Sequence, residues 1–165
     1  METKTPMKGL DKIDYQILNL LQKDSTLSTK DLAAKINLSF TPTYERIKYL
    51  EEQGIITKYV ALVDREKLGY GLMVYCNIVL KEQSKTALMN FEKAVAKLPE
   101  VLEILSISGT YDYMLKIVAK DINDYNEFVV NTIANIPNIG QYHSSIVMKE
   151  VKKETALKLN FKEEE

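Results

Sequence analysis

One stretch of the sequence contains short hydroxyl side chains followed by two flexible cations. The stretch from Ser39 to Leu50 reads SFTPTYERIKYL, and Pro42 suits the first turn of a helix because proline lacks the amide that is unpaired there. Hydroxyl groups and cations near the start of such a helix donate hydrogen bonds to phosphate oxygens and base edges. Five side chains are therefore candidates for contacts to double-stranded DNA: Ser39, Thr41, Thr43, Arg46 and Lys48.

Structural explanations compete with this chemistry. Any pair of surface helices needs polar outward faces, and short helical motifs give many false matches to DNA-binding patterns. Arg46 can instead form a salt bridge with Glu45, Glu51 or a neighbouring domain. Tyr44 is more typical of a core position than of a contact. The residues alone leave these alternatives open.

Two short helices must position these side chains. Ser28 and Asp31 have the spacing of a capping box, which predicts the start of a first helix. Thr41 is the expected N-cap of the second helix, and Gly54 suits its C-terminal end because the residue there adopts a left-handed conformation. Two helices joined by a tight turn form the helix-turn-helix layout, whose second helix enters the major groove of DNA.

A helix before this pair and a strand after it complete the predicted N-terminal domain. Asp11 and Asp14 have the spacing of another capping box, and apolar residues follow them at one-turn spacing. The segment from Ile55 to Val63 is rich in β-branched residues, which predicts a strand that forms half of a small wing. The sequence thus predicts a winged helix-turn-helix domain over residues 1–63.

The remaining sequence alternates strand and helix patterns. Strands are predicted over residues 72–81, 101–108, 113–119 and 139–151, and helices over residues 84–98 and 121–134. The order βαββαβ is that of the ferredoxin-like fold, in which both helices cover one face of a four-stranded antiparallel sheet. The predicted chain is α+β, with a linker over residues 64–71, a ferredoxin-like domain over residues 72–151 and a charged C-terminal tail over residues 152–165.

Charge and hydrophobic patterning both predict an oligomer. The net charge is −1, and residues 1–63 contain nine Lys or Arg against eight Asp or Glu. Phosphate neutralisation supplies most of the sequence-independent affinity for DNA, so one copy is expected to bind weakly. In the strand from Leu72 to Lys81 both alternating sets of residues are apolar, with Asn77 the only polar residue before Lys81, so both faces of the sheet need a cover. A second copy related by a two-fold axis provides that cover most simply.

Four segments together resemble one protein family. They are LDKIDYQIL from Leu10, LSFTPTYERIKYLEEQGII from Leu38, LGYG from Leu68 and ISGTYDYMLKI from Ile107. At these spacings the chain is similar to the leucine-responsive regulator/AsnC family of transcription factors, the feast/famine regulators. The resemblance covers nearly the whole chain. It implies a winged helix-turn-helix, homodimers formed through the βαββαβ domains, frequent assembly into octamers, and response to a small effector such as an amino acid.

The resemblance also implies an effector site in the second domain. The family's effector region matches the hairpin residues Gly109, Thr110, Tyr111 and Asp112, together with Ile136, Tyr142 and Ser144. Backbone amides at a glycine turn can hold an α-carboxylate, and Asp112 can hold an α-ammonium. The competing interpretation is that Gly109 and Asp112 are ordinary turn residues. Many family members have two threonines where this chain has Tyr142 and Ser144 around His143, and a tyrosine there narrows the expected pocket.

The sequence offers few residues for catalysis, redox chemistry or metal binding. Cys76 is the only cysteine and His143 the only histidine, so neither an internal disulfide nor a metal cluster is predicted, and no cofactor is expected. No P-loop or GxSxG motif is present. No apolar run approaches membrane-spanning length and no leader pattern opens the chain, which favours a cytoplasmic protein.

One enzyme class remains as an alternative to a regulator. Siroheme decarboxylases resemble the same two-domain architecture, and they must bind a tetrapyrrole that carries many carboxylates. Such binding calls for several Arg or His residues. The second half of this chain contains only Arg65 and His143, which favours a regulator that is not an enzyme.

Overall fold

The computed structural model describes residues 9–161 and divides them into two compact units. One unit contains the described residues up to Leu62 together with those from Lys152 onward, and the other contains Val63–Val151. The first eight residues assigned to the N-terminal domain, and residues 162–165 of the tail, lie outside the described residues. Within the described part of the chain, no helix is long and apolar enough to cross a membrane.

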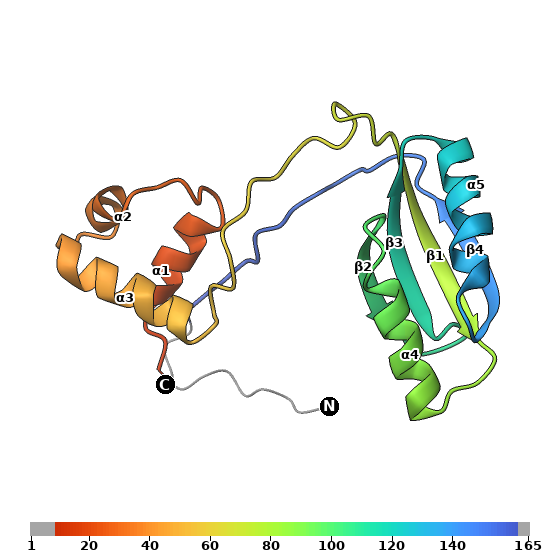
Figure 1. Cartoon of the computed structure of the whole chain (residues 1–165). Helices are drawn as coiled ribbons and strands as arrows, with labels where there is room; N and C mark the ends of the chain where they lie inside the picture. The colour runs from red at the N-terminus through yellow and green to blue at the C-terminus, as the bar shows by residue number, and fades with distance from the viewer. Residues whose placement is uncertain (1–8, 162–165) are drawn as a thin grey trace. The chain divides into compact units, whose positions relative to one another are not determined.

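The described residues of the first unit form three helices (Figure 1). They are α1 (Lys12–Leu21), α2 (Thr29–Lys35) and α3 (Phe40–Glu52). Asp11 and Asp14 form the complete capping box that their spacing predicts at the start of α1. The Ser28 side chain caps α2 by accepting a hydrogen bond from the amide of Asp31 at 3.2 Å. Apolar side chains from the three helices form the core, with Ile17, Leu18, Ile36 and Leu50 at its centre.

The start of α3 differs from the prediction. Its N-cap is Ser39 rather than Thr41, and the helix begins at Phe40. Pro42 therefore lies at the third helical position. Proline fits there too, because none of the first-turn amides has a partner within the helix. Gly54 adopts the predicted left-handed conformation, with φ of 68°.

The strand predicted from Ile55 to Val63 is wrong. Residues 57–64 have no regular secondary structure. Val60, Leu62 and Val63 in this stretch are 52%, 65% and 62% exposed. β-branched residues favour an extended backbone, but a strand also needs a neighbouring edge to pair with. The unit therefore belongs to the winged helix-turn-helix class, although residues 57–64 do not form a wing within one copy.

The C-terminal tail packs on α1. Leu159 is partly buried against the helical core, and its carbonyl accepts a hydrogen bond from the Asn19 side chain at 3.0 Å. The Gln22 side-chain amide pairs with both backbone groups of Leu157, at 3.2 and 2.7 Å. The rings of Tyr15 and Phe161 meet edge to face, with centroids 5.7 Å apart. This part of the tail is therefore a structural element of the helical unit.

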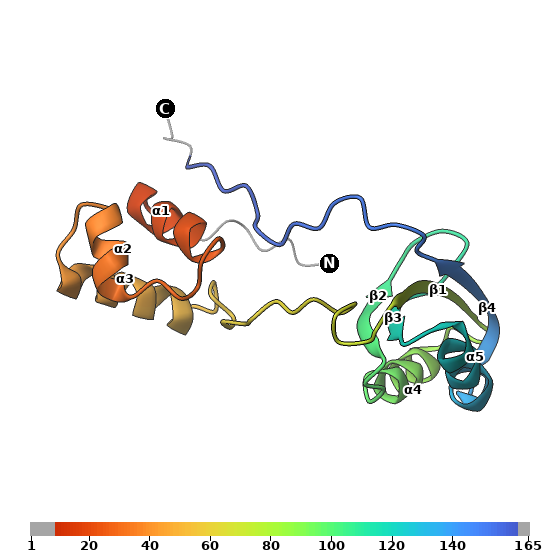
Figure 2. The same cartoon turned by 90° about the horizontal axis from the view of Figure 1, so that it is seen from above.

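The second unit is a four-stranded antiparallel sheet with two helices (Figure 1). Its elements are β1 (Leu72–Leu80), α4 (Lys85–Val95), β2 (Val101–Ser106), β3 (Tyr113–Ala119), α5 (Ile122–Asn131), the 3₁₀ turn η1 (Ile133–Asn135) and β4 (Ile139–Ile146). The strand order β2-β3-β1-β4 is that of the predicted ferredoxin-like fold. Figure 2 shows both helices on one face of the sheet. β4 is shorter than predicted, because the chain leaves the sheet after Ile146.

Strand register assigns each residue to one face of the sheet. Cys76 of β1 is opposite Leu115 of β3 and Ser144 of β4, and these residues face the helices. The next residue, Asn77, is opposite Met114 and His143 on the other face. Neither helix of this unit covers that second face (Figure 2).

Candidate nucleic-acid interface and effector site

Three of the five candidate DNA contacts are exposed on α3. Ser39, Thr41 and Lys48 are exposed, and the Ser39 side chain makes no capping hydrogen bond. Thr43 is different, since it is 0% exposed and its hydroxyl donates to the Ser39 carbonyl at 2.9 Å. Thr43 lies on the inward stripe of the helix together with Leu50, which follows it two turns later. The expectation that Thr43 faces DNA is therefore corrected: it is a core residue.

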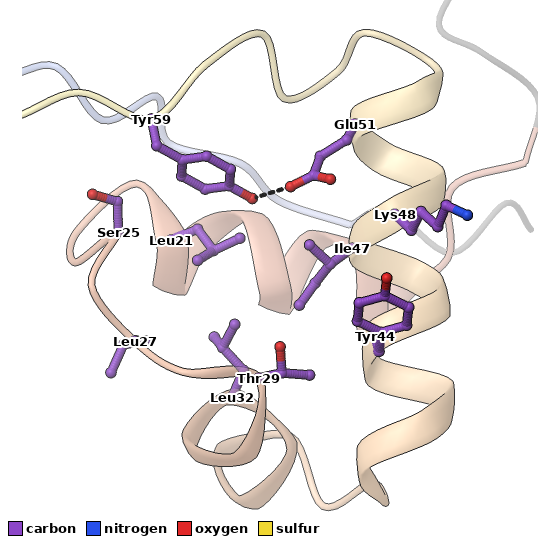
Figure 3. Close-up of a pocket in the computed structure, with 10 residues that line it drawn as sticks. All are labelled: Leu21, Ser25, Leu27, Thr29, Leu32, Tyr44, Ile47, Lys48, Glu51 and Tyr59. Carbon is purple, nitrogen blue, oxygen red and sulfur yellow. Dashed lines mark hydrogen bonds between the residues drawn. The ribbon is translucent and has the colours of Figure 1, made fainter.

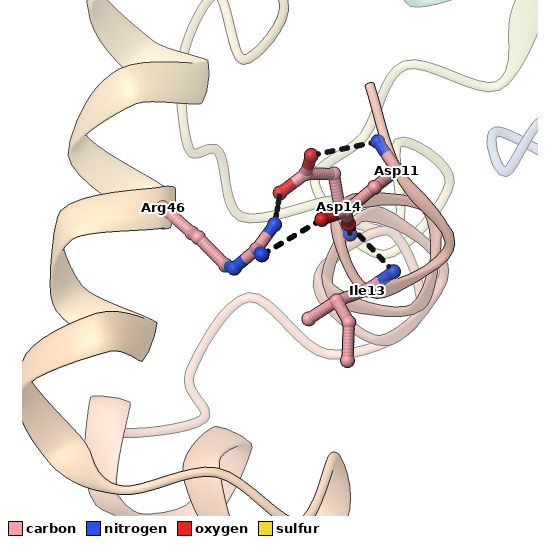
Figure 4. A network of polar contacts seen from close by, with 4 residues as sticks. All are labelled: Asp11, Ile13, Asp14 and Arg46. Carbon is pink, nitrogen blue, oxygen red and sulfur yellow. Dashed lines mark hydrogen bonds and ion pairs between the residues drawn. The ribbon is translucent and has the colours of Figure 1, made fainter. Parts of the chain in front are cut away.

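Arg46 is held by two carboxylates of α1 (Figure 4). Its guanidinium lies 2.7 Å from Asp11 Oδ2 and 2.7 Å from Asp14 Oδ1. The Asp14 side chain is only 5% exposed, whereas those of Arg46 and Asp11 are 31% and 48% exposed. The structure thus contains the salt bridge of the competing interpretation, but with partners other than Glu45 and Glu51, while a contact of Arg46 with DNA stays a prediction. Sequence alone missed them because they lie in another helix.

This network also reinforces the start of α1. Asp14 accepts a hydrogen bond from the Asp11 amide at 3.0 Å, while Asp11 accepts one from the Ile13 amide at 2.8 Å (Figure 4). Burial acts to raise the pKa of Asp11, but the hydrogen bonds from Arg46 and the two backbone amides outweigh it and lower that pKa. The hydrogen bond to Asp11 in turn raises the pKa of Arg46. The charged forms of both side chains are therefore favoured.

Two aromatic residues on the outer surface of α3 were not among the candidates. Phe40 is 56% exposed and Tyr44 is 51% exposed, so the interpretation of Tyr44 as a core residue is wrong. Their rings are nearly parallel, with an interplanar angle of 5° and centroids 6.3 Å apart. Lys48, with a 58% exposed side chain, follows them one turn later. The spacing of Phe40, Tyr44 and Lys48 was the available signal for this outer stripe.

A shallow hollow of about 250 Å³ lies beside this stripe (Figure 3). Leu27, Thr29 and Leu32 line it near α2, and Tyr44 and Lys48 line it on α3. At its edge the Tyr59 hydroxyl donates to Glu51 at 2.8 Å. Burial, together with the neighbouring Glu51 carboxylate, raises the pKa of Tyr59 to about 12. Tyr59 thus holds the chain after α3 close to that helix.

In the second unit, the candidate effector residue Asp112 has structural partners. Gly109 has φ of 116°, a conformation that favours glycine, and it opens the turn before β3. The Asp112 carboxylate accepts hydrogen bonds from the Leu80 amide at 2.8 Å and from the Gln83 side chain at 2.7 Å. Both oxygens thus pair with residues at the end of β1 and just after it, and not with its own turn. An α-ammonium group would have to share or replace the Gln83 contact.

The other effector candidates lie on both faces of the sheet. The Ser144 hydroxyl is 2.6 Å from the Tyr125 hydroxyl of α5, on the helix side. Burial is the main cause that raises the pKa of Tyr125 to about 12. The Tyr111 ring contacts His143, which faces the opposite side, with centroids 5.4 Å apart. Successive residues of β4 therefore connect the glycine hairpin on one face with α5 on the other.

The remaining candidate effector residues differ in their burial, and the thiol of Cys76 is buried. Ile136 packs on the sheet core, Tyr142 is 41% exposed, and Thr110 is exposed beside Gly109. Cys76 is 0% exposed, and burial raises the pKa of its thiol. Within residues 9–161, no group of three or more His, Cys, Asp or Glu side chains could hold a metal ion.

Two family models match the two parts of the chain. A model of the winged helix-turn-helix DNA-binding domain matches residues 10–57, and a model of the Lrp/AsnC ligand binding domain matches residues 73–157. Among curated proteins, the chain is 38% identical over 148 residues to the DNA-binding transcriptional activator DecR of Escherichia coli, covering 90% of this chain and 97% of that protein. It is also 38% identical over 154 residues to the leucine-responsive regulatory protein of Salmonella typhimurium, covering 93% and 94%.

Solved structures give the same picture. A transcriptional regulator of Neisseria meningitidis, solved as its L-Met complex, superposes with a TM-score of 0.87 at 35% identity, over 92% of this chain and 97% of that one. An AsnC family transcriptional regulator of Agrobacterium tumefaciens superposes with a TM-score of 0.85 at 39% identity, over 90% and 96%. Both the order of the domains and their folds are therefore shared along nearly the full length.

Proposed function

The chain belongs to the Lrp/AsnC family of DNA-binding transcriptional regulators, and we propose that it binds its operator through the exposed N-terminal part of α3 as a homo-oligomer. The observation that carries this proposal is the exposure of Ser39, Thr41 and Lys48 on one helix of a helix-turn-helix. Ser39 leaves the first amides of α3 without a side-chain cap, and open amides at a helix N-terminus bind phosphate. Lys48 is available as well, because its pair with Glu52 is 3.6 Å long and exposed.

We propose that two or more copies act together on one operator. With Arg46 held by α1, Lys48 is the cation on the outer surface of α3, so one copy contacts few phosphates. A dimer places two such helices at half-site spacing and doubles those contacts. The sheet face that carries Asn77 and His143, and the exposed apolar side chains of residues 60–63, are the surfaces proposed for pairing. Assembly of dimers into an octamer is the larger form proposed.

We also propose that a small amino acid modulates this binding. One relative, the regulator of Neisseria meningitidis, was solved with L-Met, and the chain contains the matching ligand-binding domain. The hairpin of Gly109 and Thr110 offers backbone groups for an α-carboxylate. The contact between Tyr111 and His143 joins this hairpin to β4, on which Tyr142 and Ser144 lie. An amino acid bound there would act on β4 directly.

Selection of DNA from a random duplex library tests the proposed function. The full-length chain should enrich a sequence with two related half-sites, and the selected duplex should bind with an affinity that falls with salt. Lys48→Ala should reduce the slope of log affinity against log salt by about one per copy that contacts DNA. Lys93→Ala, an exposed lysine of α4, is the matched control and should leave the slope unchanged. Equal slopes for the two variants would contradict the proposed interface.

Regulation in the cytoplasm rather than catalysis is the proposed role. The curated relatives described above are regulators. The competing enzyme class binds a tetrapyrrole, so protein that copurifies with tetrapyrrole absorbance, or gains it on titration, would favour that class instead. A thermal-shift screen of the amino acids identifies the effector. If no amino acid raises the melting temperature, the effector part of the proposal fails while the DNA-binding part stands.

A further inference from the structure

We propose that the stacked rings of Phe40 and Tyr44 read thymine methyl groups in the major groove, and so determine which operator the chain prefers. This inference rests on the proposed function, because it takes α3 as the helix that enters the groove. Phe40 and Tyr44 are 56% and 51% exposed on the first two turns of α3. The N-terminal residues of such a helix are those that reach base edges.

The geometry of α3 makes the pair an outward surface rather than an incomplete core. Thr43 and Leu50 are both 0% exposed and define the inward side of the helix. Phe40, Tyr44 and Lys48 follow one another at one-turn spacings on the exposed side of the helix that adjoins this inward side. The ring planes of Phe40 and Tyr44 lie within 5° of parallel. Two parallel aromatic rings expose a large apolar surface, and each side chain loses little conformational freedom on binding because it has only two rotatable bonds.

Few hydrogen-bonding side chains remain available on this surface to recognise bases, so apolar contacts with bases become more important. The commonest specific contact to guanine is a bidentate arginine, but the guanidinium of Arg46 is bound to Asp11 and Asp14 at 2.7 Å each. The outer surface near the rings therefore offers the hydroxyls of Ser39 and Thr41 and the amine of Lys48. The C5-methyl of thymine is the apolar group that the major groove presents, and aromatic side chains contact it.

The surroundings of the rings favour DNA over another protein surface. Exposed hydroxyls and a lysine near the pair suit phosphate oxygens, whereas the apolar side chains beside Tyr44, those of Leu27, Leu32 and Ile47, are buried or partly buried in the hollow. An interface between copies would be expected to surround an aromatic anchor with other apolar groups. The pair is also continuous with the N-terminus of α3, where uncapped amides attract phosphate.

Replacing single thymines by deoxyuridine tests the proposal directly. This change removes the C5-methyl and leaves base pairing intact. On the duplex selected by the full-length chain, at least one replacement in each half-site should weaken binding about four-fold, the factor that corresponds to about 0.8 kcal/mol for one buried methyl group. The same replacement should have a smaller effect on the binding of Phe40→Ala or Tyr44→Ala, because either variant removes half of the aromatic surface, and no effect on the double variant.

Tyr49→Ala is the matched control. Tyr49 is a 42% exposed tyrosine of the same helix that is not part of the stack, so this variant should keep the full four-fold effect of the lost methyl. Effects below about two-fold at every thymine for the unaltered chain would overturn the proposal while the selected duplex still supports DNA binding. A change in oligomeric mass for the Phe40 and Tyr44 variants would overturn it in favour of a protein contact. Failure to enrich any sequence would remove the proposed function, and this inference with it.

Discussion

Removing the Arg46 side chain tests whether this residue is structural. In Arg46→Leu the buried carboxylate of Asp14 loses its charged partner at 2.7 Å but keeps the hydrogen bond from the Asp11 amide at 3.0 Å. Removal of one partner from a fully buried ion pair costs about 3–5 kcal/mol. The Arg46 side chain is 31% exposed, so water reaches part of the site and reduces the penalty. We expect the free energy of unfolding to fall by about 2 kcal/mol.

Urea denaturation followed by far-ultraviolet circular dichroism measures this loss. The matched control is Lys48→Leu, on the same helix, whose exposed pair with Glu52 at 3.6 Å should contribute less than about 0.5 kcal/mol. A second variant separates charge from packing. Adding Asp14→Asn to Arg46→Leu removes the unpaired charge but keeps an acceptor for the Asp11 amide, so it should recover about 1 kcal/mol of the loss.

Two results would refute this account. If Arg46→Leu is no less stable than Lys48→Leu, the network between α1 and α3 does not support the fold. If Asp14→Asn makes the Arg46→Leu chain still less stable, an unpaired charge is not the cause of the loss. DNA affinity measured well below the urea transition then shows whether Arg46 contributes to binding once stability is accounted for.

Other expected outcomes concern single residues. Thr43→Val should lower the free energy of unfolding by about 1 kcal/mol through the lost hydrogen bond to Ser39, with unchanged operator affinity by gel mobility shift; weaker binding at full stability would show that Thr43 reads DNA after all. The pKa of Asp11 is lowered from 3.8, so its ion pair with Arg46 stabilises the fold above that pH. The stability difference between the unaltered chain and Asp11→Asn should therefore shrink as the pH falls below 3.8. A constant difference in urea titrations would be inconsistent with the network. The Cys76 thiol should react with a chromogenic disulfide reagent only after denaturation, because it is 0% exposed and burial raises its pKa; fast reaction of the native protein would contradict its position in the sheet core.

The features that sequence predicted correctly are those with local causes. The capping box of Asp11 and Asp14 depends on residues three positions apart, and the structure reproduces it. The left-handed Gly54 likewise follows from the end of one helix. The alternating strands and helices of the second domain predicted its fold because each pattern reports the burial of its own element.

The features that sequence missed depend on partners far along the chain. The sequence neighbours of Arg46 are the same whether its side chain contacts DNA or α1. Only the packing of the helices makes Asp14 its partner. Thr43 was predicted to contact DNA because of its hydroxyl group, although its spacing from Leu50 placed it on the inward stripe of the helix. The segment 55–63 has strand-forming residues but no regular structure from Thr57 onward, since propensity does not supply a second edge.

The return of the tail to α1 means that the helical unit is not one continuous piece of sequence. Leu157, Leu159 and Phe161 come from the far end of the chain, yet they complete the surface of a helix that begins at Lys12. Recombination that exchanged only residues 1–63 between relatives would combine α1 of one parent with the C-terminal tail of the other. Changes in the tail and in Tyr15 are therefore expected to accumulate together, and a chimaera that keeps both ends from one parent should fold better than one that mixes them.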